Sequence, residues 1–399
     1  MALFWQRSDA AGLDNPPEDD DDEGQKKFLR PKAFVSCIIA PEQPSICDGA
    51  AVTVSGDRCV IFGGRVDDEA TNECSEFAQD KWTPLLTKAP PSPRVGHSIV
   101  RYDGGVLLYG GETPKGYDKK IYYLDLNTKT WTPFDDKKGP APRAYASLCR
   151  WGRYCVLFGG VGADEKPLND LWHLDHEGKR FRWHQRITKS MPAPRQHHAA
   201  VALTGKMFLF GGKEQKSTDL QKVDVLDLVS HEWTLVETQG QGPRCAHVLA
   251  HVIGGGPLEK KNAASICVVS RSHLEANAVF NDVYLLQDPL STPIWVSLQL
   301  DWLSDWTLIP AFRKNHFSCA HERTGQLLIF GGTSHGFPAD TVISLDLAQA
   351  AGLTAEEEDA AQDADNNNRS FRLQRDGQDT DHDNVESLAG LHFAERPHI

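Results

Sequence analysis

The chain of 399 residues lacks three features that would place it in a membrane or an oxidising compartment. No apolar run approaches the ~18 residues that a membrane-spanning helix needs. The nine cysteines form no CxxC pair, so neither a disulfide framework nor a structural zinc site is expected. The first 24 residues have neither the apolar core of a secretory signal nor the arginine-rich composition of a transit peptide. These absences predict a cytoplasmic protein, with the nucleus as the alternative location, and no membrane partner.

The sequence also lacks the short motifs of several enzyme classes. It contains no GxxxxGK[ST] phosphate loop, no GxSxG nucleophile elbow and no HExxH metal motif. We therefore expect no catalytic residues, no metal and no cofactor, and we predict that the protein is not an enzyme.

The charge of this chain, net −13, is concentrated at its two ends. Residues 1–24 carry net −7 and residues 348–399 carry net −8, which leaves +2 for the residues between them. Acidic, low-complexity segments cannot bury enough apolar surface to offset the entropy lost on ordering. We predict disordered tails at 1–32 and 348–399 around a folded domain at 33–347. Because that domain is nearly neutral, no nucleic-acid partner is expected.

A short apolar phrase that ends in two glycines recurs along the chain. It reads CVIFGG, VLLYGG, CVLFGG, MFLFGG and LLIFGG, beginning at residues 59, 106, 155, 207 and 327. The first three intervals are 47, 49 and 52 residues, and the last is 120, about twice that period. A degenerate copy at 265–288, with Ser270 and Arg271 in place of the glycines, fills the gap. The chain therefore contains six repeats.

Further residues keep a fixed register with the glycines. A tryptophan follows each of the first four glycine pairs: Trp82, Trp131, Trp183 and Trp233. An arginine follows each tryptophan after 11 or 12 residues, and a looser fifth copy exists: Arg94, Arg143, Arg195, Arg244 and Arg313. In three consecutive repeats the first glycine comes 16 residues after the arginine. A register kept at several points indicates one structural unit repeated.

Each unit is expected to form four short antiparallel strands. A lone four-stranded sheet cannot bury both faces, whereas radial stacking of such sheets covers them. The tryptophans should fill the space between sheets, with their indole N–H groups reaching backbone partners. The glycines end a strand where a Cβ would clash or where φ is positive. They are Gly63, Gly64, Gly110, Gly111, Gly159, Gly160, Gly211, Gly212, Gly331 and Gly332.

The glycine pair, the aromatic residue before it and the tryptophan, at this period, resemble the kelch repeat. The resemblance covers residues 33–347 and implies an all-β fold, a six-bladed kelch β-propeller with four-stranded antiparallel blades. The fifth repeat departs from the pattern, since it lacks the glycine pair and has an insertion near 254–265. The first also departs, with SICDGAAV where SPRVGHSIV would stand.

Two segments could supply the outer strand of the sixth blade. Residues 32–51 resemble 81–100, which makes 33–39 a fourth strand, and we expect Phe34, the aromatic residue of that strand, to take the place of the tryptophan. Residues 369–374 are the alternative. We favour the N-terminal segment, which would join the two ends of the folded domain.

Two positions in each repeat are candidates for contact with a protein or peptide partner. The repeated arginines could surround one mouth and bind carboxylates or phosphopeptides through their forked geometry. The position after the glycine pair, which includes Arg65 and Lys213, is the second. The alternative for the arginines is structural, because they could bond to carbonyl groups or aspartates at blade junctions.

The family resemblance implies a non-catalytic interaction module, a scaffold or adaptor acting as a monomeric propeller. Three alternatives stay open. They are a kelch-type enzyme or specifier-like metal protein, a cytoskeletal scaffold for actin or axonemal partners, and a substrate receptor of a cullin ubiquitin ligase. We expect no BTB domain, which precedes the propeller in many kelch adaptors.

Overall fold

The structure, a computed structural model, describes only part of the chain. The described residues are 32–38, 49–177, 180–215, 223–238, 247–253, 265–271, 283–287, 289–290, 293–302, 317–320, 326–331, 333–334, 337–338 and 342–347. Within these ranges the regular elements are β-strands, and no helix of membrane-spanning length and hydropathy is found there. The predicted tails, Arg244, Arg313, Gly332 and residues 369–374 lie outside the described residues.

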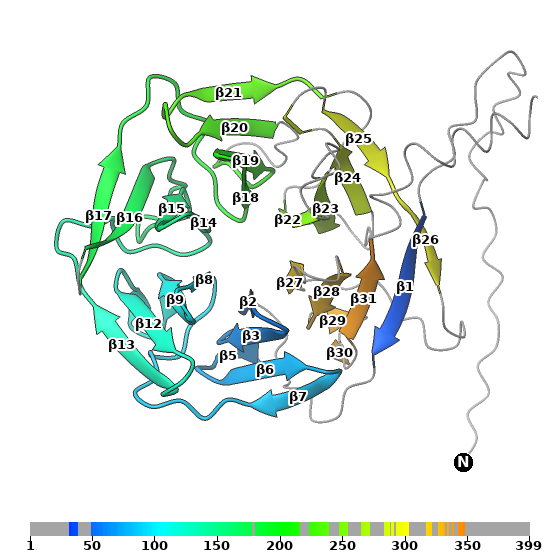
Figure 1. The fold of residues 1–399 in the computed structure, drawn as a ribbon. Coiled ribbons are helices and arrows are strands. Elements are labelled where there is room, and N and C mark those ends of the chain that lie inside the picture. The colour runs from blue at the N-terminus through cyan, green and yellow to red at the C-terminus, as the bar shows by residue number, and fades with distance from the viewer. Residues whose placement is uncertain are drawn as a thin grey trace, which may run out of the picture.

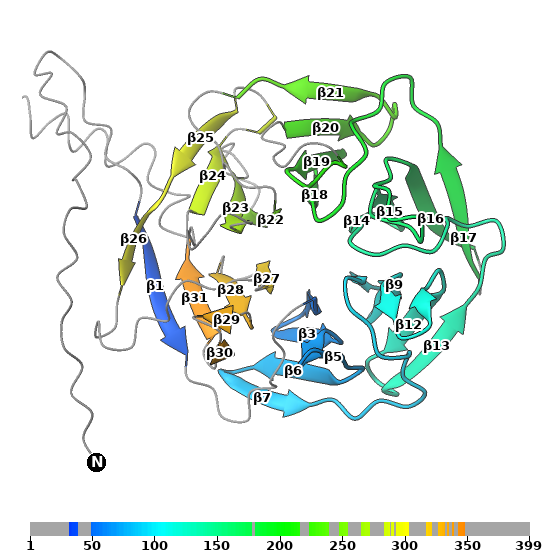
Figure 2. The ribbon, with the colours of Figure 1, turned by 180° about the vertical axis from the view of Figure 1, so that it is seen from behind.

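Six sheets surround a common axis, so the predicted six-bladed propeller is confirmed (Figure 1). The innermost strands of successive blades contact one another in a closed circle: β2, β8, β14, β18, β22, β27 and again β2. The degenerate fifth repeat forms a complete blade despite its missing glycines. The same ring is seen from behind in Figure 2.

The first three blades each contain four antiparallel strands, given from the axis outwards. Blade one has β2 (Ala51–Ser55), β3 (Arg58–Phe62), β6 (Cys74–Ala78) and β7 (Lys81–Pro84). Blade two has β8 (Ser98–Tyr102), β9 (Gly105–Tyr109), β12 (Ile121–Asp125) and β13 (Thr130–Phe134). Blade three has β14 (Ser147–Trp151), β15 (Tyr154–Phe158), β16 (Leu171–Glu177) and β17 (Arg180–Arg186).

Blades four and five also have four strands each, whereas blade six has five. Blade four has β18 (Ala199–Leu203), β19 (Lys206–Phe210), β20 (Val223–Asp227) and β21 (Trp233–Val236). Blade five has β22 (His247–Ile253), β23 (Ser265–Arg271), β24 (Val283–Gln287) and β25 (Ile294–Ser297). Blade six has β27 (Phe317–Ala320), β28 (Gln326–Phe330), β31 (Val342–Asp346), β1 (Lys32–Ile38) and β26 (Gln299–Trp302).

Three short hairpins, each built of two strands of two residues, connect the second and third strands of their blades. They are β4 (Arg65–Val66) with β5 (Glu69–Ala70) in blade one, β10 (Glu112–Thr113) with β11 (Gly116–Tyr117) in blade two, and β29 (Thr333–Ser334) with β30 (Phe337–Pro338) in blade six. They differ in sequence, so these three blades carry different loops on the same face of the ring.

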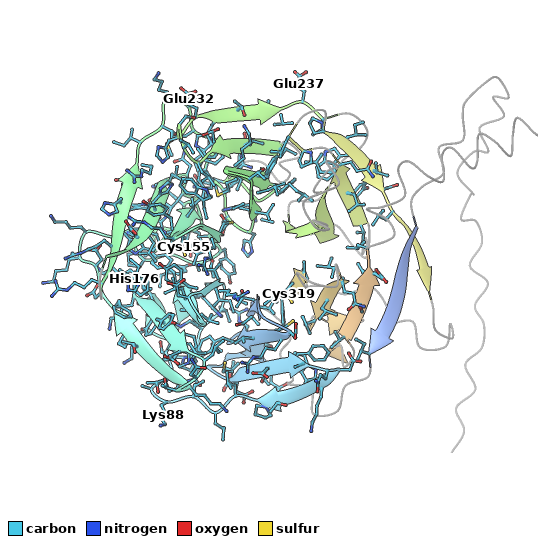
Figure 3. All side chains as sticks on the ribbon, in the orientation of Figure 1. Lys88, Cys155, His176, Glu232, Glu237 and Cys319 are labelled. Atoms are coloured by element: carbon cyan, nitrogen blue, oxygen red, sulfur yellow. The ribbon has the colours of Figure 1, made fainter. Side chains whose placement is uncertain are left out.

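The second strand is buried on both of its faces in blades one to four and in blade six. In β9, Val106, Leu107, Leu108 and Tyr109 are all 2% exposed or less. A continuous apolar run is the pattern expected of a strand covered on both sides, because side chains alternate between faces. Side chains therefore fill the space between neighbouring sheets (Figure 3).

One aromatic contact recurs between neighbouring blades. The aromatic residue before the glycines of one blade packs against the tryptophan in the outer strand of the next. Ring centroids lie 5.0–5.9 Å apart in the pairs Phe62–Trp131, Tyr109–Trp183, Phe158–Trp233, Phe210–Trp295 and Phe330–Trp82. Tilted and edge-to-face rings at this separation stabilise beyond their buried area. The repeated tryptophans thus act between blades.

The junction between blades five and six is built differently. The backbone pairing of β1 with β31 sets Val35 opposite Leu345, as Trp131 stands opposite Leu124 in blade two. Val35 rather than Phe34 therefore occupies the tryptophan position, one residue from the expected alignment. On blade five, Val269 stands where other blades have the aromatic residue. At this junction the two backbone positions that hold the aromatic pair elsewhere are therefore occupied by valines.

Strand β26 adds backbone pairing next to this junction. It follows β25 of blade five after one residue and then pairs in parallel with β1, from Lys32–Gln299 to Val35–Trp302. Strand β1 is therefore held between β31 and β26, and the chain of blade five reaches over to blade six (Figure 1). This pairing covers both edges of the strand that joins the start of the domain to its last blade.

Removing β1 is expected to destabilise the whole ring. A variant without residues 1–40 should melt roughly 5–10 °C below the full chain. Losing one strand costs several kcal/mol of stability, and each kcal/mol lost lowers the melting temperature of a domain of this size by roughly 2 °C. A variant without residues 1–31, which keeps β1, is the matched control and should melt with the full chain. Equal melting of both truncations, measured by calorimetry, would contradict a closing role for β1.

Candidate functional site

One face of the ring carries the residues that the repeat pattern singled out. On it lie the ends of the second strands, the starts of the first and third strands, and the three hairpins. We call it the glycine face, formed in the described residues by 49, 63–73, 92–97, 110–120, 143–146, 159–170, 195–198 and 211–215. The opposite face carries the turns between first and second strands and between third and fourth strands.

Arg143 shows how the repeated arginine is held. Its Nε donates a hydrogen bond to the carbonyl of Ala141 at 3.0 Å, and its Nη1 donates to the carbonyl of Gly159 at 3.0 Å. Its Nη2 donates to a carboxylate oxygen of Asp170 at 2.7 Å. The side chain is 1% exposed. The guanidinium thus joins the loop before the first strand, the glycine pair and the start of the third strand.

Arg94 and Arg195 repeat this arrangement in blades two and four. Their Nη1 atoms donate to the carbonyl groups of Gly110 and Gly211, at 2.8 and 3.2 Å. Their Nη2 atoms donate to Asp118 and Asp224, at 3.1 and 2.7 Å. These contacts recur at the same places in three consecutive blades.

The same arginines connect each blade to the one before it. The amide of the second glycine donates to the carbonyl of the next blade's arginine at 2.9 Å, from Gly64 to Arg94, Gly111 to Arg143 and Gly160 to Arg195. A Cβ on the first glycine would lie 2.5–2.9 Å from that same carbonyl oxygen at Gly63, Gly110 and Gly159. Any side chain would separate the blades.

Backbone conformation imposes a second requirement on the glycines. The nine described members of the glycine pairs all have φ between +57° and +99°. A side chain is disfavoured in this left-handed region, most strongly near +100° where the second glycines lie. Two adjacent glycines are needed because the chain turns sharply at the end of the strand, where the backbone of the next blade is in contact with it.

The aspartates that hold the arginines were not identified from the sequence. Asp118 and Asp170 precede the third strands of their blades, and Asp224 is the second residue of β20. Although burial opposes ionisation, the hydrogen bonds and charge of Arg143 lower the pKa of Asp170. An acidic residue at the start of successive third strands was the available signal, but strand boundaries were needed to recognise it.

These contacts correct the hypothesis that the repeated arginines face a partner. Arg94, Arg143 and Arg195 are 0–2% exposed and their donors are used within the ring. The structural alternative describes these three residues. Arg244 and Arg313 lie outside the described residues, so their role stays a prediction.

The residues after the glycine pairs lie at the surface to different degrees. Arg65 and Lys213 are half-buried on the glycine face. Lys213 exchanges backbone hydrogen bonds with Gln196, at 2.9 and 3.1 Å. Contact of these two side chains with a partner stays a prediction.

The indole N–H groups differ from expectation. Trp82, Trp131 and Trp183 are buried and Trp233 is half-buried. The Nε1 atoms of Trp82, Trp131 and Trp233 lack a hydrogen-bond acceptor. These indole side chains therefore stabilise the propeller by packing on aromatic neighbours and not through hydrogen bonds to the backbone.

Three buried histidines lie among the described residues at blade junctions. Burial, followed by the charge of the nearby arginine, lowers the pKa of His97 and of His198 to about 3. Burial and Arg186 lower that of His173 to about 3. His97 and His198 pack edge-on against Phe62 and Phe158 of the preceding blade. Neutral imidazoles thus belong to the packed junctions.

Replacing Arg143 should destabilise the protein strongly. Arg143→Ala leaves Asp170 without its cation and two carbonyl groups without a donor, so we expect a loss of about 3–5 kcal/mol in the free energy of unfolding. Arg65→Ala, on the same face, should cost less than about 1 kcal/mol. The measurement is urea denaturation of both variants. Equal stabilities would refute the architectural role.

Mild acid should destabilise the ring through its neutral histidines. Because their pKa in the folded state lies below the usual value of 6.5, stability is complete above pH 6.5 and falls as the pH drops from there towards 3. Each such histidine contributes about 1.4 kcal/mol per pH unit in that window.

His198→Asn should therefore show a smaller loss of stability between pH 7 and pH 5 than the parent. His176→Gln is the control, because His176 stacks on Phe181 at the outer part of the ring and is only half-buried (Figure 3). An identical pH slope in His198→Asn and the parent, followed by calorimetry, would count against this origin of acid sensitivity.

Comparison with known proteins places this architecture in a family. The model of a family described as the KLHDC2/KLHL20/DRC7 Kelch-repeats domain matches residues 49–256, which span blades one to four and the start of blade five. That match includes all the described arginine contacts.

Three curated relatives have similar sequences. Putative adagio-like protein 2 of Oryza sativa subsp. japonica is 28% identical over 198 residues, which are 48% of this chain and 28% of the relative. Host cell factor 2 of Homo sapiens is 27% identical over 238 residues, 50% of this chain and 30% of the relative. The dynein alpha chain of the flagellar outer arm of Chlamydomonas reinhardtii is 30% identical over 242 residues, 54% of this chain and 5% of the relative.

This chain thus spans less than a third of the length of each of these relatives. The family model, by contrast, covers just over half of this chain, and its kelch repeats coincide with blades that the structure shows. The chain belongs to the kelch-repeat propeller family.

Proposed function

We propose that this protein is a non-catalytic scaffold or adaptor that binds a protein partner on its glycine face. One observation carries the proposal. The arginines and glycines at the blade junctions repeat from blade to blade, whereas the loops of the glycine face differ in sequence. The hairpins Arg65–Ala70 and Glu112–Tyr117 and the loop at 161–168 share no sequence pattern. Loops that vary on a rigid frame are where binding residues concentrate.

The described side chains offer more support for binding than for catalysis. The buried arginines, aspartates and histidines are used in the blade junctions. Among the described residues no group of three histidine, cysteine or acidic side chains is placed to hold a metal ion. The cysteines with a shifted pKa, such as Cys74 and Cys149, have it raised to about 12 by burial, which disfavours the reactive thiolate.

A cytoskeletal partner is the second candidate, and one comparison favours it. A relative of 30% identity over 242 residues is the dynein alpha chain of the flagellar outer arm. A similar stretch within a motor chain supports a scaffold role for this chain at the cytoskeleton. It would still bind through exposed loops, so the same experiment addresses both candidates.

The proposal is tested by partner capture with charge-swapped faces. Glu69→Lys with Lys115→Glu exchanges two exposed charges on the glycine face and keeps the net charge. Lys81→Glu with Glu232→Lys does the same on the opposite face, where Glu232 lies at the outer edge of blade four (Figure 3). Affinity purification from the native cell should lose a specific protein only with the first pair, while both variants melt like the parent.

Two results would contradict the proposal. One is the capture of no protein beyond a bait-free control. The other is loss of the partner with the opposite-face pair alone. Copurification of cullin would assign the protein to a ubiquitin ligase as an adaptor. Copurification of tubulin or actin would assign it to the cytoskeleton.

A further inference from the structure

The ring closes where blade six meets blade one. Blade six contains β1, which ends at Ile38, and the chain enters blade one with β2 at Ala51. The innermost strands β27 and β2 contact one another, and the rings of Phe330 and Trp82 pack between the two blades with centroids 5.5 Å apart. Backbone pairing and side-chain packing therefore join the last blade to the first.

Two cysteine side chains meet inside this junction. Cys59 lies on β3 of blade one, and Cys319 lies on β27, the innermost strand of blade six (Figure 3). Their Sγ atoms are 3.1 Å apart, and the two residues are 1% and 4% exposed. Of the five cysteines whose side chains the structure describes, these two form the pair in sulfur contact. The fold thus brings together two thiols that are 260 residues apart in the sequence.

Regular strand pairing holds both cysteines in place. Cys59 stands opposite Val54 in the pairing of β3 with β2, and Cys319 stands opposite Leu328 in the pairing of β27 with β28. A disulfide needs its sulfur atoms about 2.0 Å apart, so the two side chains have to approach by about 1 Å. Because the contact crosses from one blade to the next, it depends on the two blades being packed together.

The surroundings of the pair are apolar. Both cysteines belong to a buried cluster that includes Phe77, Phe317 and Phe330. Burial, and then the contact with Cys59, raises the pKa of Cys319 well above its usual value. The thiolate is the nucleophile in thiol–disulfide exchange, so the closed junction disfavours oxidation, and its packing excludes an oxidant of peptide size. The pair becomes reactive when the junction opens.

We propose that Cys59 and Cys319 form an oxidation site, at which glutathione disulfide converts the two thiols into a disulfide between blade one and blade six. The reaction takes place during local opening of the junction, and reclosure returns the new bond to the packed core. This inference does not depend on the partner-binding function proposed above. It also differs from a permanent disulfide framework, because the pair stays reduced without the oxidant.

The exchange has two steps that conserve atoms and electrons. One cysteine loses its proton to solvent, and its thiolate attacks a sulfur of glutathione disulfide, which breaks the S–S bond and releases one glutathione thiolate. The second cysteine, also as a thiolate, attacks the protein sulfur of the mixed disulfide and releases the other glutathione thiolate. The released thiolates take up the two protons. The cysteine pair is thus oxidised by two electrons, and glutathione disulfide is reduced to two glutathione molecules.

The new bond stabilises the closed ring. A cross-link between distant positions removes conformations from the unfolded chain, and this effect grows with the length of the loop. The linked positions are 260 residues apart, from the first blade to the last. The bond also joins the two blades directly, so they remain connected even when β1 separates from β31.

The test is a peptide map of the oxidised full-length protein. The reduced protein is incubated with glutathione disulfide without denaturant, quenched with acid, alkylated with N-ethylmaleimide and digested with trypsin. Mass spectrometry should find the peptides of Cys59 and Cys319 joined to each other. In calorimetry the oxidised protein should melt roughly 4–8 °C above the reduced protein, and dithiothreitol should remove this gain.

Two alanine variants separate this pair from the other thiols. Cys319→Ala should lose both the linked peptide and the rise in melting temperature. Cys149→Ala is the matched control, because Cys149 is also buried at a blade junction, between blades three and four, and it should keep both. Each variant is compared with its own reduced form, so the stability lost with the side chain cancels. If Cys319→Ala does not fold, the peptide map of the parent decides.

Three outcomes would overturn the inference. The first is recovery of Cys59 and Cys319 as alkylated residues or as separate glutathione adducts. The second is a link from either residue to another cysteine in place of their own bond. The third is a linked pair without any gain in melting temperature, or an equal gain in Cys319→Ala. None of these outcomes bears on the capture of a partner by the glycine face, so the proposed function is tested separately.

Discussion

A buried guanidinium beside a pair of glycines is the contact on which the described half of the ring depends. Arg143 binds the carbonyl of Gly159 and the carboxylate of Asp170 within its own blade, and its own carbonyl accepts the amide of Gly111 from the blade before. One residue thereby fixes a loop, a strand end and a neighbouring sheet. Because a buried cation without its partners is costly, the arrangement is retained as a whole or lost as a whole.

Aromatic packing completes the junctions and sets their direction. At five junctions an aromatic residue of one blade contacts the tryptophan of the next, so each sheet is covered by its neighbour in the same rotational sense. The junction of blades five and six has valines at these backbone positions and gains the pairing of β26 with β1. Backbone pairing thus reinforces the place where the ring closes and the aromatic pair of the other junctions is not repeated.

A frame held in this way leaves the glycine face available for variation. The buried junction residues cannot change without loss of packing, whereas the hairpins can. The hairpins of blades one and two show this freedom, since RVDDEA at 65–70 and ETPKGY at 112–117 share no sequence pattern.

The sequence by itself determined the repeat, and through it the number of blades, the strand order and the position of the glycines. A period that returns five times over is a local signal, and each copy reports the same geometry. Tertiary structure decided what each repeated polar residue does, because Arg94 could have pointed to solvent or into the ring with the same spacing. It also decided the register of β1, where Val35 and not Phe34 faces Leu345. Pairing between the two ends of a chain, and stacking of rings such as Tyr145 and His197 from separate blades, depend on long-range contacts that sequence spacing does not encode.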